Sequence, residues 1–284
     1  MHGVNCPSGW LVATDLDHTL FSDPASAGLA GAAIRAVEAE GVPVIPVSSK
    51  TFAEMLRFLA DAGLSPRPFL FENGCGIGWP EQCAAPPADM APLARQEGCA
   101  AFLLTAPAVA ARASVRSLLG RHGPASRLLE DMAPEELAAL TGLDESAAIL
   151  AGQRLASVPV LWRNGPEALA AFRAELAAQG WAAVSGGRFV HVSARWDKAR
   201  GLARLRDWLG SEARYARLLA CGDSENDREM LEAADLALVF PGPGGAWMSL
   251  ARPARRVPAA GPAAWRQAVL EGIRQHAAPL ESVA

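Results

Sequence analysis

The sequence predicts an α/β fold, with a Rossmann-like parallel sheet formed by both ends of the chain and an α+β segment inserted between them. Near each end, short apolar runs alternate with helical patterns, which is typical of βαβ units and of a parallel sheet. Two acidic motifs, Asp15-Leu16-Asp17 and Gly222-Asp223, directly follow apolar runs in the two end regions. One domain built from both ends brings these motifs together and is the simplest organisation.

Before residue 84 the pattern predicts three strands and two helices. The strands are residues 10–16, Val42–Val47 and Phe69–Phe71, and the helices are Ala27–Glu40 and residues 51–62. Gly41 and Gly63 follow the two helices, as glycine often does at a helix end. Pro43 and Pro46 have no N–H for a sheet ladder, so we expect them near the two ends of the second strand.

The middle of the chain has a different character. Residues 80–99 are rich in Pro, Ala and Cys and lack periodicity, which indicates a linker or an irregular crossing. Beyond them we expect a helix at Ala133–Leu140, a strand at Leu155–Trp162, a helix from Asn164 to Gly180, and a hairpin with strands Trp181–Ser185 and Arg188–Ser193. Gly186-Gly187 is a two-residue hairpin signal. A helix followed by an antiparallel hairpin is an α+β arrangement.

The strand–helix alternation returns towards the C-terminus. We expect helices at Lys198–Leu209, Asn226–Ala234 and Ala263–Gln275, and strands at Leu218–Cys221 and Leu236–Val239. The predicted organisation is a core domain of residues 1–84 and 196–284 and an inserted cap domain of residues 85–195.

Length, charge and composition limit the class of protein. The chain has 284 residues, enough for one large domain or two modest ones, and its net charge of −4 argues against a nucleic-acid partner. Five cysteines without a C-x-x-C pair argue against a disulfide framework or a zinc site and favour a reducing cytoplasm. No apolar stretch approaches the roughly 18 residues of a membrane span, and no signal peptide is apparent. We therefore expect a cytoplasmic protein without a membrane partner, as a monomer or a weak homodimer.

The acidic motifs predict a divalent cation at one edge of the sheet. Ligands of open α/β sheets bind at the carboxyl ends of the strands, where Asp15, Asp17, Asp223 and Asp227 are all expected. Four carboxylates in one crevice repel one another unless a hard cation lies among them, and oxygen ligands of this kind suit Mg²⁺. We expect Asp223 to contact the metal and Asp227 to orient the other ligands from the following helix.

The same edge carries residues suited to phosphoryl transfer. Asp15 and Asp17 lie two residues apart, so one carboxylate can attack phosphorus while the other protonates the leaving oxygen and later accepts a proton from water. Ser48 offers a hydroxyl and a backbone N–H to a phosphoryl oxygen, next to a helix N-terminus. Lys198 begins a helix and can neutralise the developing charge. Lys50, close to Ser48 in sequence, is also expected at the site.

Taken in order along the chain, these motifs resemble the haloacid dehalogenase superfamily of phosphatases. The matching residues are Asp15-Leu16-Asp17-His18-Thr19, Ser48-Ser49-Lys50-Thr51, Lys198 and Gly222-Asp223-Ser224-Glu225-Asn226-Asp227. The resemblance implies a parallel-sheet core with an inserted α+β cap of the larger (C2) type and Mg²⁺ as cofactor. It makes Asp15 the nucleophile and Asp17 the general acid/base. Asp15, the Asp17 carbonyl and Asp223 would hold the metal, and Ser48 and Lys198 would bind the phosphoryl group.

Finer details resemble the mannosyl-3-phosphoglycerate phosphatases of that superfamily. They are Glu54-Met55, Glu72-Asn73-Gly74, Thr141-Gly142-Leu143, Leu161-Trp162-Arg163 and Gly187–Val192. This likeness implies a small phosphorylated sugar or glycerate substrate under a mobile cap, with mannosyl-3-phosphoglycerate giving mannosylglycerate and phosphate as the first choice. The candidate substrate-binding residues are Ser49, Lys50, Asn73, Gly74, Arg154, Arg163, Arg188, His191 and Asn226.

Some positions depart from the family pattern, and other functions stay open. His18 stands where the family usually has Gly, and residues 157–159 lack the acidic side chain that many members carry in this cap strand. Glu225 is an additional acidic residue, which we expect near the metal. The nearest alternative is another sugar phosphatase of this fold, acting on glucosyl-3-phosphoglycerate, sucrose phosphate or hexose phosphates. A phosphomutase shares the first chemical step. A non-catalytic phosphosugar-binding protein would not need Asp15 beside Asp17.

Overall fold

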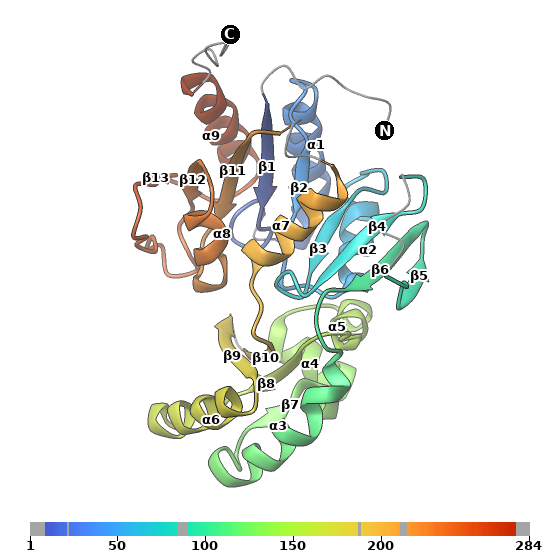
Figure 1. Cartoon of the computed structure of the whole chain (residues 1–284), viewed down its shortest axis with the longest axis vertical. Coiled ribbons are helices and arrows are strands. Elements are labelled where there is room, and N and C mark those ends of the chain that lie inside the picture. Colours follow the sequence, from blue (N-terminus) through green and yellow to red (C-terminus); the bar gives the residue numbers. More distant parts are fainter. Residues whose placement is uncertain (1–8, 22, 84–89, 187–188, 211–214, 277–284) are drawn as a thin grey trace.

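The computed structural model describes residues 9–21, 23–83, 90–186, 189–210 and 215–276. Figure 1 shows two groups of elements. The upper group, which we call the core, holds the parallel sheet and the helices that cover it. The lower group, which we call the cap, holds the helices and strands between residues 108 and 194.

The core is built on a parallel sheet with the strand order β13-β12-β11-β1-β2. In that order its strands are Arg255–Arg256, Leu236–Val239, Arg217–Gly222, Trp10–Thr14 and Val44–Pro46. Strands β1 and β11 come from opposite ends of the chain and pair in register from Trp10↔Arg217 to Thr14↔Cys221. This pairing confirms the prediction that both ends of the chain form one parallel sheet. Pro46 ends β2 and Pro43 precedes it, as expected.

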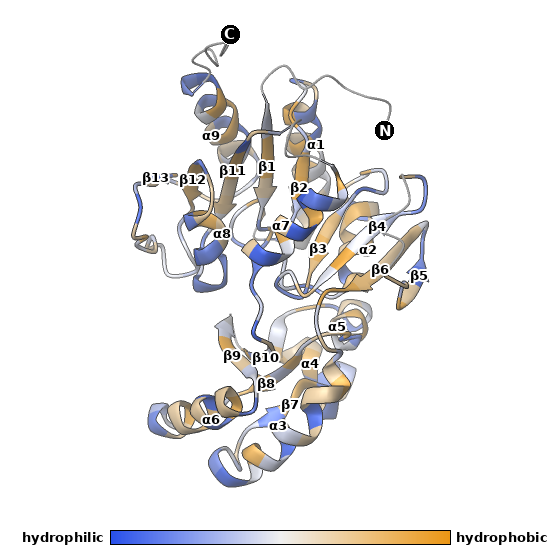
Figure 2. Ribbon diagram, in the orientation of Figure 1, coloured by the Kyte–Doolittle hydropathy of each residue, from blue (hydrophilic) through white to orange (hydrophobic). Residues whose placement is uncertain are grey.

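Helices cover both faces of this sheet. They are α1 (Ala27–Glu38), α2 (Phe52–Asp61), α7 (Lys198–Trp208), α8 (Arg228–Glu232) and α9 (Pro262–Gln275). Along β1, Trp10 and Val12 enter the hydrophobic cluster that contains α1, α2 and α9, whereas Leu11 and Ala13 enter the cluster that contains α7 and α8. The alternation follows from the two-residue period of a strand. Because the sheet is covered on both faces, its strands are mostly hydrophobic (Figure 2).

The segment after β3 (Phe69–Phe71) differs from the prediction. A parallel bridge between Val47 and Leu70 joins β3 to the core sheet, but β3 also begins an antiparallel sheet of order β3-β4-β6-β5. The added strands are β4 (Gly76–Pro80), β5 (Ala94–Gln96) and β6 (Cys99–Leu103). Residues 99–102 pack into both hydrophobic clusters of the core. The expected linker is therefore wrong for residues 94–99, and we place the start of the insertion after Leu103 instead of at residue 85.

The cap is an antiparallel sheet that carries helices. Its strand order is β7-β8-β10-β9, that is Arg127–Leu128, Val158–Leu161, Phe189–Ala194 and Trp181–Gly186. Helices α3 (Ala108–His122) and α6 (Pro166–Ala178) pack on the sheet, and α4 (Pro134–Thr141) and α5 (Glu145–Gly152) form a smaller cluster. The predicted helices and strand of this segment and both strands of the predicted hairpin are present, whereas β7, α3 and α5 were not predicted. Of the predicted turn Gly186-Gly187, Gly186 ends β9 and Gly187 lies outside the described residues. No helix in the described part of the chain is long and apolar enough to cross a membrane.

The cap meets the core on two sides of the carboxyl edge of the sheet. Helix α5 packs against α2, and β9 lies beside the 3₁₀ turn η3 (Glu225–Asp227). At the first contact the Thr51 hydroxyl donates to the Leu150 carbonyl at 2.9 Å, and the Arg57 guanidinium binds Asp144. The edge at which the acidic motifs end therefore has cap elements on both sides.

Candidate active site

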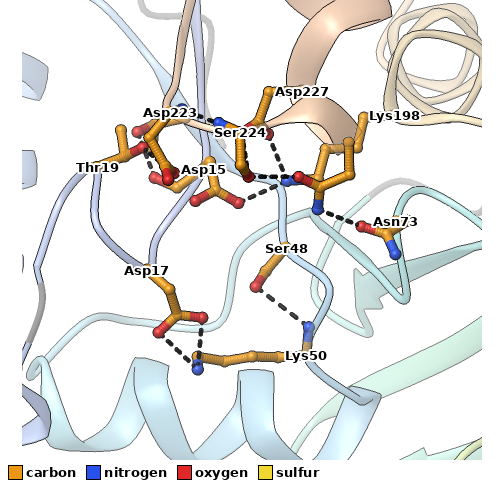
Figure 3. Close-up of polar contacts among 12 residues, drawn as sticks. Asp15, Asp17, Thr19, Ser48, Lys50, Asn73, Lys198, Asp223, Ser224 and Asp227 are labelled. Carbon is orange, nitrogen blue, oxygen red and sulfur yellow. Dashed lines mark hydrogen bonds and ion pairs between the residues drawn. The ribbon is translucent and has the colours of Figure 1, made fainter. Parts of the chain in front are cut away.

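The two acidic motifs lie side by side where β1 and β11 end (Figure 3). The backbone N–H of Asp15 donates to the Cys221 carbonyl at 2.9 Å, which extends the strand pairing into the site. Asp15, Asp223 and Asp227 are buried, and each offers a carboxylate oxygen within 4.8 Å of those of the others. Motifs far apart in the sequence thus meet in one crevice, because the two strands that carry them are neighbours.

Lys198 lies among these carboxylates and is fully buried. Its Nζ is 2.5 Å from Oδ1 of Asp15 and 2.6 Å from Oδ1 of Asp227. Lys198 is the first residue of α7, whose N-cap Asp197 accepts a hydrogen bond from the Arg200 N–H at 2.8 Å. Burial lowers the pKa of Lys198, but the two carboxylates more than offset this effect, so the pKa lies above its usual range. The side chain is therefore a cation.

The cluster has an excess of negative charge. With all three carboxyl groups ionised and Lys198 as an ammonium group, the cluster would carry two net negative charges. Burial raises the pKa of Asp15 well above its usual value, and Lys198 only partly reverses this. Burial and the charge of Asp227 raise the pKa of Asp223 to about 7. A divalent cation would supply the two missing positive charges, and the oxygen-only donor set fits Mg²⁺.

Asp227 and Asp223 are held in place by hydrogen bonds. Oδ2 of Asp227 accepts from the backbone N–H groups of Asp223 and Ser224, both at 3.1 Å. The Thr19 hydroxyl donates to Oδ1 of Asp223, also at 3.1 Å. Thr19 was not among the predicted site residues, although its place at the end of the first acidic motif was the available signal. Both acidic motifs thus contribute to orienting Asp223.

Gly222 provides the space that Asp227 occupies. A Cβ on Gly222 would lie 2.5 Å from Cβ and 2.6 Å from Cγ of Asp227. We expect Gly222→Ala to displace Asp227 and to lower the free energy of unfolding by about 1–3 kcal/mol, as overpacking does. Chemical denaturation measures this. Gly28→Ala is the matched control, because a Cβ there meets nothing within 4 Å. Equal stability of the two variants would contradict the assigned role of Gly222.

Asp17 lies apart from the other carboxylates and faces Lys50 (Figure 3). The Lys50 Nζ is 2.9 Å from Oδ1 and 2.8 Å from Oδ2 of Asp17, whose side chain is 43% exposed. The Asp17 side chain is therefore more exposed than the three buried carboxylates. The turn that follows Asp17 is tight: the His18 N–H donates to the Phe21 carbonyl at 2.8 Å, and His18 has φ of 62°. His18 thus adopts the left-handed conformation for which glycine is better suited.

The predicted phosphate-binding residues of the core gather around the cluster. Ser48 is buried, and its Oγ accepts from the Lys50 N–H at 3.2 Å. The Ser48 carbonyl accepts from the Asn73 N–H at 2.9 Å. The Asn73 Oδ1 in turn accepts from Nδ2 of Asn226 at 2.9 Å. Residues from three separate loops therefore contact one another directly.

Gly74 has a packing role as well as a place beside the site. Its φ is 81°, and a Cβ there would lie 2.8 Å from the Asp197 carbonyl oxygen. A Cβ on Gly201 would lie 2.5 Å from the Gly74 carbonyl oxygen. The indole N–H of Trp196 donates to that same carbonyl at 2.8 Å. These close approaches bring the start of α7, and with it Lys198, against the loop that carries Gly74.

The structure separates the predicted cap residues. Arg154 reaches the core, where it donates to the Ser49 carbonyl at 2.8 Å and lies 3.9 Å from Glu54. His191 is buried in the middle of β10. Arg163 is exposed and follows the end of β8, while the start of β8 is the end that contacts the core. Arg163 is therefore not brought to the carboxylate cluster.

Two further predictions concern single acidic and basic residues. Arg188 lies outside the described residues. Glu225 does not join the carboxylate cluster: its carboxylate binds the Arg228 guanidinium at 2.6 Å, and its side chain is 63% exposed. The additional acidic residue of the second motif is therefore a surface ion-pair partner.

Comparison with known proteins places the fold. No family model matches the chain. A protein of Thermoplasma acidophilum is similar at 15% identity over 93% of this chain and 97% of that one, with a TM-score of 0.61. The sucrose-phosphatase of Synechocystis, solved in complex with sucrose and phosphate, is similar at 14% identity over 94% and 97% of the two chains (TM-score 0.60). A haloacid dehalogenase-like hydrolase from B. subtilis is similar at 17% identity over 81% and 88% (TM-score 0.52). The chain therefore has the fold of the haloacid dehalogenase-like hydrolases, a parallel-sheet core with an inserted α+β cap.

Proposed function

We propose that this protein is a Mg²⁺-dependent phosphatase that hydrolyses a phosphorylated sugar derivative through an aspartyl-phosphate intermediate. The observation that carries the proposal is the buried cluster of Asp15, Asp223 and Asp227 around Lys198 at the carboxyl edge of the sheet. A nucleophile, a divalent-cation site and a fixed ammonium group are what phosphoryl transfer requires. The fold likeness to a sucrose-phosphatase supports a sugar ester as substrate.

In the first step, a carboxylate oxygen of Asp15 attacks phosphorus as the bond from phosphorus to the leaving oxygen breaks. Asp17 takes part in its carboxylic acid form, gives its proton to that leaving oxygen and becomes a carboxylate, and the sugar alcohol departs. In the second step, water attacks the phosphoryl group on Asp15, Asp17 takes the proton from that water, and inorganic phosphate and the Asp15 carboxylate are released. The exposure of Asp17 suits this role, because its carboxyl must reach both a leaving group and water.

The other residues bind and neutralise the phosphoryl group. Mg²⁺, held by Asp15, Asp223 and the Asp17 carbonyl with Asp227 beside them, would neutralise charge on the phosphoryl oxygens. Lys198 adds a fixed positive charge next to Asp15. Ser48, in contact with Lys50 and Asn73, would donate its hydroxyl to a phosphoryl oxygen.

A pocket between α2 and the cap residues 142–150, which follow α4 and include most of α5, offers a place for the leaving group. Its volume is about 310 Å³. Phe21, Lys50, Arg57, Leu143 and Asp144 are among its lining residues, which combine apolar surface with charged groups that bind hydroxyls. Lys50 also contacts Asp17, so the pocket begins beside the proposed acid/base. Mannosyl-3-phosphoglycerate is our first choice of substrate, ahead of glucosyl-3-phosphoglycerate, sucrose phosphate and hexose phosphates.

A phosphate-release screen over these esters tests the proposal. We expect inorganic phosphate from at least one of them, with kcat/KM for mannosyl-3-phosphoglycerate about tenfold or more above the others, since a site that pairs a substrate's hydroxyls discriminates strongly. A higher kcat/KM for another sugar ester would change the assigned substrate but not the assigned phosphatase reaction. No phosphate from any ester would overturn the phosphatase. Isomerised phosphosugar without free phosphate would indicate a phosphomutase.

Removal of the metal gives a direct prediction. Because the three carboxylates, once ionised, outnumber the single ammonium group of Lys198, EDTA should abolish phosphate release, and excess Mg²⁺ should restore it. Thermal denaturation at increasing Mg²⁺ concentrations should show that Mg²⁺ raises the melting temperature, since a ligand that binds only the folded state stabilises it. Full activity in the presence of the chelator would rule out the metal requirement.

A further inference from the structure

Glu72 is a buried acidic residue that the proposed reaction does not use. Its side chain is 1% exposed. Oε1 accepts the backbone N–H of Leu155 at 2.7 Å, and Oε2 accepts the backbone N–H groups of Ala156 (3.0 Å) and Ser157 (2.7 Å) and the Ser157 hydroxyl (2.6 Å). Among the ion pairs of the described residues none includes Glu72, so donors on the cap segment 155–157 balance its charge.

Glu72 belongs to a strained loop of the core, residues 72–75. Glu72 and Asn73 have φ of 47° and 59°, left-handed values that non-glycine residues rarely adopt. Backbone bonds hold this conformation: the Glu72 N–H donates to the Lys50 carbonyl at 2.8 Å, and the Asn73 N–H donates to the Ser48 carbonyl at 2.9 Å. Strain of this kind persists only where the surroundings fix it, and it is common at functional sites.

Both chain crossings between the core and the cap contact the 72–75 loop, and so does the start of β8. The entry into the cap begins after β6, where the Leu104 N–H donates to the Cys75 carbonyl at 2.9 Å. The return to the core precedes α7, where Trp196 donates to the Gly74 carbonyl at 2.8 Å. The third contact is the start of β8, which Glu72 holds through residues 155–157. The chain itself makes the first two crossings, whereas at the third contact the buried carboxylate of Glu72 makes the attachment.

The same loop also contacts the catalytic segments. Asn73 binds Asn226 of the second acidic motif, and Gly74 packs against the start of α7, next to Lys198. Beside the loop, Arg154 at the start of the held segment donates to the Ser49 carbonyl. Displacement of the start of β8 would therefore disturb the phosphate-binding loop and the second acidic motif together.

We propose that Glu72 is a positioning residue, which fastens the start of β8 to the 72–75 loop and thereby couples the placement of the cap to the phosphate-binding site. The kinetic consequence of this role rests on the proposed phosphatase function, whereas the attachment itself does not. Without the attachment the cap occupies its productive position less often. For a substrate that contacts both the cap and the core, the apparent affinity then falls in proportion to the population of the productive position. The chemical step is unchanged once the substrate is bound.

Glu72→Gln is the sharpest test, because it keeps the size of the side chain. If the amide oxygen takes the place of Oε2, the amide NH₂ group must face the N–H of Leu155, so one bond becomes a repulsion of two donors and the negative charge is lost. We expect hydrogen–deuterium exchange of the amides of residues 155–157 to be at least about tenfold faster than in the wild type, since bonds to a charged acceptor are the stronger ones. For the best ester of the screen, KM should rise about tenfold with kcat within about twofold.

Glu38→Gln is the matched control. The Glu38 carboxylate is also paired, at 2.6 Å from the Arg67 guanidinium, but both partners belong to the core. This variant should leave exchange at 155–157 and both kinetic constants unchanged. Ser157→Ala, which removes only the hydroxyl donor, should change exchange and KM in the same direction as Glu72→Gln but less, and it serves if Glu72→Gln does not fold.

The outcomes separate the two proposals. Unchanged exchange at 155–157 in a folded Glu72→Gln or in Ser157→Ala would overturn the attachment, whether or not the protein is a phosphatase. Faster exchange with unchanged KM and kcat would reduce Glu72 to a structural residue and overturn the positioning role. A fall in kcat at constant KM would place Glu72 in the chemistry and also overturn it. If the wild-type protein releases no phosphate, the proposed function fails while the exchange experiment still decides the attachment.

Discussion

Asp15→Asn is expected to abolish phosphate release while leaving the protein folded. The substitution keeps the shape of the side chain and removes the nucleophilic oxygen, and the loss should be at least about 10³-fold, since single members of a catalytic unit contribute up to about 10⁶-fold. The fold should survive, because burial already disfavours the charged form of Asp15 and raises its pKa. Lys198 keeps its second partner, Asp227, at 2.6 Å. Phosphate release and circular dichroism measure the two results.

Asp207→Asn is a suitable control for that experiment. Asp207 lies on α7, the helix that begins with Lys198, and its side chain is 54% exposed with a long contact of 3.9 Å to Arg204. This variant should keep full activity and the same circular dichroism spectrum. Residual turnover of Asp15→Asn within tenfold of the wild type would exclude Asp15 as the nucleophile.

The parts of the site that the sequence predicts well are those fixed by strand ends. A buried parallel strand is a continuous apolar run, so the positions of Asp15 and Asp223 follow from where β1 and β11 stop. The register Thr14↔Cys221 then brings them together. Lys198 is similarly predictable, because Asp197 marks the start of its helix. Local sequence patterns are therefore sufficient to predict where these three side chains lie in the fold.

The antiparallel sheet β3-β4-β6-β5 shows where such patterns fail. Gly76 and Gly78 in β4 lie beneath the rings of Phe71 and Phe69, and a Cβ on either glycine would lie within 2.1 Å of a ring carbon. Glycine usually weakens a strand, so the composition of this segment predicts a loop. Only the cross-strand phenylalanines explain why glycine is needed there. The turn between β5 and β6 is also unusual, with Glu97 (φ of 50°) where hairpins favour Asn or Asp.

Contacts between the cap and the core cannot be predicted from local sequence patterns, for a different reason. Glu72 belongs to the motif Glu72-Asn73-Gly74, but its partners lie more than eighty residues further along the chain. Arg154 likewise has the positive charge expected of a substrate-binding residue, but its guanidinium donates to the Ser49 carbonyl instead. A long polar side chain has many possible partners, and only the tertiary fold selects one.

Lys198→Met is expected to have the largest effect on stability. The ammonium group is fully buried and lies within 2.6 Å of both Asp15 and Asp227. Methionine fills similar space but leaves three buried carboxylates without a counter-charge. Removing one partner of a buried ion pair costs about 3–5 kcal/mol, so the free energy of unfolding in EDTA at pH 8 should fall by about that amount. Activity should be lost as well, because the fixed charge beside the nucleophile is gone.

The pH dependence of this loss follows from the raised carboxyl pKa values. Asp223 has a folded-state pKa of about 7 against 3.8 for the free group, so its ionised form destabilises the fold above pH 7 and its protonation relieves the destabilisation as the pH falls towards 4. Without Lys198 the carboxyl pKa values rise further, and the stability difference from the wild type should shrink across that range. Urea denaturation at pH 8 and pH 5 measures it, and Mg²⁺ at pH 8 should recover part of it by replacing the missing charge. Arg228→Met, which removes an exposed cation paired with Glu225, should change stability little at either pH. A loss for Lys198→Met that was equal at both pH values would mean that the buried carboxylates are not its cause.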